Sequence, residues 1–176
     1  ASLAAPKTWR NIYLSTGEIS AKSRMETDKK VAKAGQMLRL MDIPTDDGII
    51  IETRNTTPAK FADDLKENCS KHYGWAGPTF VETFLKEIKD DPSTNFQTLE
   101  ESNKYYQNEL KENDLEPEQN RALARLALVW HAGKLASDFG IIPLDEIEDI
   151  EPAMQYIKKT WLKANRTLTD TGRAVK

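Results

Sequence analysis

Residues 10–18, RNIYLSTGE, and residues 34–44, AGQMLRLMDIP, decide the fold that the sequence predicts. In the first stretch, the apolar side chains of Ile12 and Leu14 predict a short strand that is buried on both faces. In the second stretch, apolar side chains alternate with others from residue 37 onward, which predicts a second strand. Pro44 ends this strand, because proline cannot continue a central ladder.

The apolar spacing becomes helical from residue 57. Thr57 is a predicted N-cap that precedes a proline at the first helical position. Further helices are predicted after Pro78, over 96–110, from Pro117 to Gly140, and over 145–163. With a brief third strand at 49–51, the fold class is α+β, mainly α: two to three N-terminal strands and a bundle of about five helices. The predicted domains are 1–56 and 57–176.

Composition limits the possible classes of protein. The chain has 176 residues, of which 39% are hydrophobic and 30% charged, which favours a globular protein over a disordered one. Its formal net charge of -3 excludes a globally basic nucleic-acid binder, but it allows a local basic patch. No run approaches the roughly 20 apolar residues that a membrane helix needs, so no membrane partner is expected.

Cysteine and histidine are scarce in this sequence. The single cysteine, Cys69, cannot form an internal disulfide and favours a reducing, cytoplasmic location. It lies on the predicted apolar stripe of its helix, which predicts a core thiol. The two histidines, His72 and His131, are far apart in sequence, so no metal site is predicted. The acids at 145–151 match no calcium loop and are expected to favour a helix start.

A strand, a polar loop and a strand with one internal arginine are typical of the second half of nucleotide-hydrolysing cores. No G-x-x-x-x-G-K-[ST] phosphate loop occurs in the sequence. The chain begins without methionine and reaches a core strand abruptly at Trp9, so we expect a part cut from a longer protein; a processed start is the alternative. The predicted strands would form the edge of a P-loop ATPase sheet, and the chain alone would bind no cofactor.

Several short blocks then carry a family resemblance. They are WR (9–10), LSTGEIS (14–20), KAGQ (33–36), DIP (42–44), FAD (61–63), HYG (72–74), AGP (76–78) and AGKLA (132–136). In this order they resemble a family of bacterial and phage-type DNA primase/helicase-like proteins, in which a domain of unknown function carries a P-loop ATPase core. The resemblance implies a nucleic-acid-dependent ATPase, with ATP and Mg²⁺ bound by the full-length protein, DNA as partner and a possible homo-oligomer.

Three residues are candidates for a catalytic role in such an ATPase. Ser15 and Thr16 follow the first predicted strand, where they would sense the γ-phosphate; a local turn that caps the next helix is the alternative. Arg39 is the only charged side chain between residues 37 and 41, and a buried arginine needs a partner. It would act as an arginine finger on a neighbouring subunit. A salt bridge to Asp42 or Glu52, or an outward-facing position, is the alternative.

Basic residues supply two further candidate surfaces. Lys29, Lys30 and Lys33 lie in a basic run that would hold nucleic-acid phosphates; a solvated loop is the alternative. Arg121 and Arg125 share a helix face and would reach a bound nucleotide from a helical lid. Ordinary pairing with Glu116 or Glu118 is the alternative for these two arginines.

Two functions from different classes follow. The first is the C-terminal part of a helicase-type ATPase, which would be inactive alone because it lacks the phosphate loop. The second is a non-catalytic helical protein-interaction module of a phage or mobile element. A small enzyme is a weaker third option, because no nucleophile–base pair and no metal-ligand spacing supports it.

Overall fold

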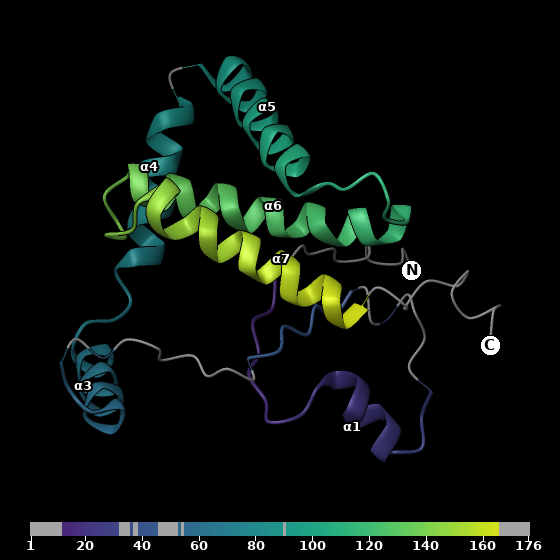
Figure 1. Ribbon diagram of the computed structural model, residues 1–176. Helices are drawn as coiled ribbons and strands as arrows, with labels where there is room; N and C mark the ends of the chain where they lie inside the picture. The colour runs from purple at the N-terminus through teal and green to yellow at the C-terminus, as the bar shows by residue number, and fades with distance from the viewer. Residues whose placement is uncertain are drawn as a thin grey trace, which may run out of the picture. The chain divides into compact units, whose positions relative to one another are not determined.

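The computed structural model describes residues 12–31, 36, 39–45, 53, 55–89 and 91–165. The chain divides into two compact units, Ala1–Ala32 and Lys33–Lys176, and each unit is described by itself. Every regular element in the described residues is a helix (Figure 1). The domain boundary expected between residues 56 and 57 stays a prediction.

The predicted N-terminal strands are wrong. Residues 12–17 form no ladder, and Ile12, Tyr13 and Leu14 are 70%, 82% and 97% exposed. A strand needs a neighbouring strand for its backbone hydrogen bonds, and none exists among the described residues. Apolar residues in a short run therefore do not suffice to make a strand.

Where the second predicted strand is described, at residues 36 and 39–44, the backbone forms a turn and no ladder. The N–H groups of Arg39 and Leu40 both donate to the Gln36 carbonyl oxygen at 3.1 Å, and the Asp42 N–H donates to the Leu40 carbonyl at 3.1 Å. These local hydrogen bonds compete with the extended backbone that a ladder requires. The brief strand predicted at 49–51 lies outside the described residues.

In the first unit, the described regular element is the short helix α1, Ala21–Thr27. Ser20 is its N-cap: its hydroxyl oxygen accepts from the Ser23 N–H at 3.0 Å. No residue of α1 is buried, so the helix is defined by its cap and not by a core.

The second unit confirms the helices predicted from residue 57 onward. They are α3 (Pro58–Lys71), α4 (Ala76–Lys89), α5 (Pro92–Leu110), α6 (Pro117–Asp138) and α7 (Glu151–Asn165), with the π-helix η1 (Glu146–Ile150) directly before α7. The predicted cap of α3 is present, because Thr57 Oγ1 accepts from the Lys60 N–H at 3.2 Å. Gly140, with φ +67°, follows α6, where the Ile141 N–H donates back to the Ala136 carbonyl at 2.9 Å.

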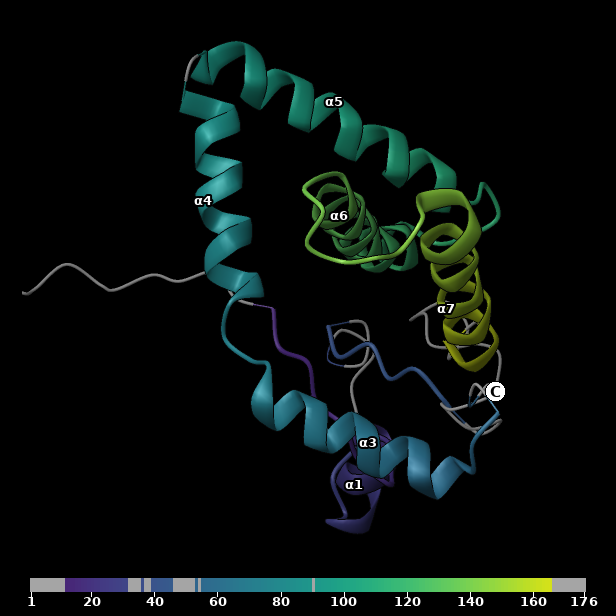
Figure 2. The same ribbon diagram turned by 90° about the vertical axis from the view of Figure 1, so that its left-hand side faces the viewer.

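The hydrophobic core lies between α5, α6, η1 and α7: α5 crosses α6, and η1 and α7 pack against α6 and each other (Figures 1 and 2). Trp161, Leu110 and Leu123 are the largest fully buried side chains. The other buried members of the cluster are Tyr106, Ala122, Leu126, Ala127, Trp130, Ile150, Met154 and Leu162.

Helices α3 and α4 contribute no buried residue to this core. α4 contacts the bundle through one side, where the rings of Phe80 and Phe139 lie 5.6 Å apart. α3 does not pack extensively on any other described helix, and its Leu65 is 51% exposed. The apolar residues of α3 therefore have helical spacing, as predicted, but they do not face a core.

Candidate functional site

A cavity with a volume of about 580 Å³ lies beside α7. Such a volume lies within the range of small-ligand sites. Five of its lining residues come from α7 and one from the connection between α5 and α6. They are Gln155, Lys158, Lys159, Leu162, Lys163 and, from the connection, Glu112.

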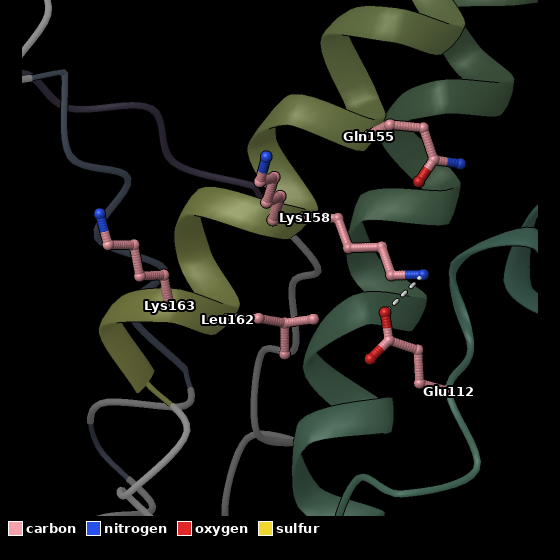
Figure 3. A pocket seen from close by; sticks show the side chains of 6 residues that line it. Glu112, Gln155, Lys158, Leu162 and Lys163 are labelled. Atoms are coloured by element: carbon pink, nitrogen blue, oxygen red, sulfur yellow. Dashed lines mark ion pairs between the residues drawn. The ribbon is translucent and has the colours of Figure 1, made fainter.

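An ion pair closes one side of this α7 cavity. Lys158 Nζ lies 3.1 Å from Glu112 Oε1, and the Lys158 side chain is only 10% exposed. Figure 3 shows Lys158 extending toward Glu112, whereas Lys163 points away from this pair. The Lys158 ammonium is therefore already neutralised by protein.

The other two lysines of the cavity are available. Lys159 and Lys163 are exposed and lie one helical turn apart, about 6 Å along the axis. Neither has a carboxylate within ion-pair distance in the described part of the chain. Among the described lining residues, three lysines against one glutamate leave two positive charges in excess. This arrangement attracts anions, and it contains no nucleophile with an adjacent base.

A second, smaller hollow of about 350 Å³ lies between α4, α5 and α6. Phe84, Ile88, Leu99, Leu135 and Phe139 give it an apolar lining, and its charged lining residues are Glu87 and Asp138. Asp138 is paired with Lys134 at 2.6 Å, so this hollow offers little free charge. Among the described residues, no group of three or more His, Cys, Asp or Glu side chains is placed to hold a metal ion.

A polar network joins α5, α6 and η1 at the edge of the core. Tyr106 Oη donates to Glu146 Oε1 at 2.6 Å, and Lys134 lies 3.5 Å from Glu146 Oε2. Burial, followed by the hydrogen bond to Glu146, raises the pKa of Tyr106. The hydrogen bond to Asp138 raises the pKa of Lys134. Both groups therefore hold their protons at neutral pH, which suits a structural network and not proton transfer.

His131 gives this network a dependence on pH. Burial, and then the positive charge of Lys134, lowers the pKa of His131 below its ordinary value of 6.5, although Asp138 and Glu146 oppose the shift. The unfolded chain therefore takes up a proton before the folded chain does. Burial of neutral His131 therefore favours the folded chain fully above pH 6.5. We expect this part of the free energy of unfolding to be lost as the pH falls below 6.5.

Urea denaturation of the wild type and of His131→Gln between about pH 7.5 and 5.5 checks this expectation. The wild type should lose stability more steeply over this range. The remaining histidine, His72, is exposed and present in both proteins. Parallel curves for the two proteins would contradict the assignment.

The predicted catalytic residues lie in exposed segments without strands. Ser15 and Thr16 lie before α1 in the first unit, in a segment without helix or strand, and Arg39 belongs to the turn in the second unit. Arg39 is exposed, so the buried strand position that made it a candidate is wrong. A role for these residues in a complete ATPase stays a prediction.

The predicted basic surfaces are only partly described. Lys29 and Lys30 are exposed just after α1, and Lys33 lies outside the described residues. Arg121 and Arg125 are exposed on α6, one turn apart, and Arg121 pairs with Glu118 at 2.8 Å, which was the alternative expected for it. Cys69 is exposed, so the predicted core thiol is wrong.

Sequence reasoning missed the lysines of α7. A signal was present, because residues 158–176 contain six lysines and arginines and one acid, Asp170, in a chain of net charge -3. The helical pattern of this region drew attention to its apolar stripe instead. Glu112, the ion-pair partner of Lys158 in the cavity, lies far from α7 in the sequence.

The chain was compared with protein families, curated proteins and solved structures, and no family model, curated protein or structure matches it. None of the described helices is long and apolar enough to cross a bilayer.

Proposed function

We propose that the chain is a non-catalytic helical module that binds the phosphate backbone of nucleic acid through the α7 cavity. The observation that carries this proposal is the lining of the cavity, where three lysines meet one carboxylate. Because Glu112 holds Lys158, the contacts to phosphate come from Lys159 and Lys163. The Gln155 amide, on the same cavity wall, adds a neutral donor of a kind that commonly contacts phosphate.

An extended polyanion fits this cavity better than a compact ligand. The two lysines assigned to phosphate contact, Lys159 and Lys163, lie about 6 Å apart along the α7 axis, so each can contact a separate phosphate. Lysines that follow a helix suit successive phosphates of a strand. An anionic membrane fits less well, because Leu162, the one apolar residue among the described lining residues, is 5% exposed and has little side chain to insert.

Anisotropy of a short fluorescein-labelled oligodeoxythymidine, titrated with the full chain at several salt concentrations, tests the proposal. We expect weak binding that falls as salt rises, because the contacts displace counterions. The double variant Lys159→Glu/Lys163→Glu should weaken binding about tenfold at low salt and flatten the logarithmic salt slope by about 1.4.

Lys60→Glu/Lys71→Glu is the matched control. It changes the net charge equally, on two exposed lysines that pair with acids of their own helix, α3. An equal loss of binding in this control would overturn the proposal, since only net charge would then matter. A loss confined to Lys29→Glu/Lys30→Glu/Lys33→Glu would move the site to the basic run at residues 29–33. Equal binding to anionic vesicles and oligonucleotide would favour a membrane.

The ATPase part of the sequence-based hypothesis remains a separate prediction. It depended on strands that the described residues do not form, and on a resemblance whose phosphate loop would precede residue 1. Binding of nucleic acid through α7 requires neither of these features. The proposal therefore concerns this chain as it stands.

A further inference from the structure

The exposed side of α4 carries apolar side chains that the core leaves unused. Phe80, Phe84 and Ile88 are half-buried on the side that faces the bundle. Val81 and Leu85, one turn apart on the adjoining side, are each 54% exposed. A helix that keeps an apolar stripe in water without a partner forgoes the stabilisation that its burial would supply.

The charged side chains beside this stripe also form no ion pair among the described residues. Glu82 and Lys86 lie one turn apart along one border of the stripe, at the spacing where acid and base commonly pair. Pairs at this spacing form within 4.0 Å on α1, α3, α5 and α6. On α4, neither Glu82 nor Lys86 has an ion-pair partner among the described residues. Both charges are therefore free to contact another molecule.

We propose that α4 pairs with the α4 of a second copy of this chain, antiparallel and across a two-fold axis near residues 83 and 84. In this arrangement Val81 of each copy meets Leu85 of the other. Because the two-fold axis is perpendicular to both helices, the border of α4 that carries Glu82 and Lys86 lies beside the same border of the second copy. Glu82 of each copy then meets Lys86 of the other, and both new ion pairs form at once. The single stripe is thus self-complementary in both apolar contact and charge.

Sedimentation equilibrium of the full chain over a wide concentration range tests the pairing. We expect a weak monomer–dimer equilibrium, since two half-exposed side chains per copy form a small interface. Leu85→Glu should raise the dimer dissociation constant at least tenfold. Leu128→Glu, at a residue of α6 that is 48% exposed, is the matched control and should leave the constant within about twofold of the wild type.

Charge variants distinguish this specific α4–α4 pairing from non-specific self-association. Glu82→Lys alone and Lys86→Glu alone place like charges opposite each other, so each should dimerise less than the wild type. An equimolar mixture of the two should associate, because lysines on one copy then face glutamates on the other. A monomeric wild type at every concentration, or a mixture no more associated than its components, would overturn the proposal. Circular dichroism confirms that each variant remains helical.

Discussion

Trp161→Ala should lower the free energy of unfolding by about 3–5 kcal/mol. Trp161 is fully buried, with 0% exposure, among the side chains of the core between α5, α6, η1 and α7. Its removal takes apolar surface out of the core and leaves a cavity that neighbouring helices fill only partly. Because small domains have a total stability of about 5–15 kcal/mol, this loss would remove a large share of the free energy that keeps the chain folded.

Urea denaturation followed by circular dichroism measures this loss. Trp75→Ala is the matched control, since Trp75 is 53% exposed just before α4 and should cost far less. Trp161→Phe should cost less than Trp161→Ala, because the indole Nε1 has no hydrogen-bond partner among the described residues and the ring volume is largely kept. Similar losses for Trp75→Ala and Trp161→Ala would contradict the assigned core.

Glu112→Ala should lower the stability of the chain and strengthen its binding to an oligonucleotide. It leaves the Lys158 ammonium, 10% exposed, without its carboxylate 3.1 Å away, so the chain should lose stability. We expect about 1–3 kcal/mol, less than the 3–5 kcal/mol typical of fully buried pairs, because water reaches part of the Glu112 side chain. At the same time one more positive charge becomes free in the α7 cavity, which should strengthen oligonucleotide binding and steepen its salt slope by about 0.7.

Lys158→Met separates the two effects. Methionine keeps most of the side-chain volume and removes the buried charge, so its cost should be smaller than that of Glu112→Ala. Its salt slope should not steepen, because Lys158→Met frees no lysine and leaves the Glu112 carboxylate of the cavity without its partner. Glu100→Ala, which removes the partner of the exposed Lys104 at 3.1 Å, should change neither property much. An unchanged melting temperature in Glu112→Ala would contradict a structural role for the pair.

The two sets of variants also separate fold from function. Trp161→Ala removes the packing that holds α7, so binding of nucleic acid should fall together with helicity. Lys159→Glu/Lys163→Glu changes exposed side chains of a helix whose core contacts remain, so binding should fall while helicity is kept. A loss of helicity in the latter would mean that these lysines support the fold.

The helices from residue 57 onward could be predicted from the sequence because their signals are local. Thr57 and Pro58 specify a helix start through one side-chain acceptor and one missing donor, and both act within a single turn. Gly140 ends α6 because glycine adopts a positive φ at little cost. Such signals need no knowledge of the rest of the chain.

Strands, burial and the α7 cavity could not be predicted in this way, because each depends on distant residues. Ile12 and Leu14 have strand-like character, but no ladder partner for them exists among the described residues. Cys69 lies on an apolar stripe, yet α3 has no core to face and the thiol is exposed. Lys158 is buried only because the fold brings Glu112 beside α7. The sequence by itself determined that helices follow residue 57 and where α3 and α6 begin. The tertiary structure decided which helix faces are buried and, among the described residues, which charges have no ion-pair partner.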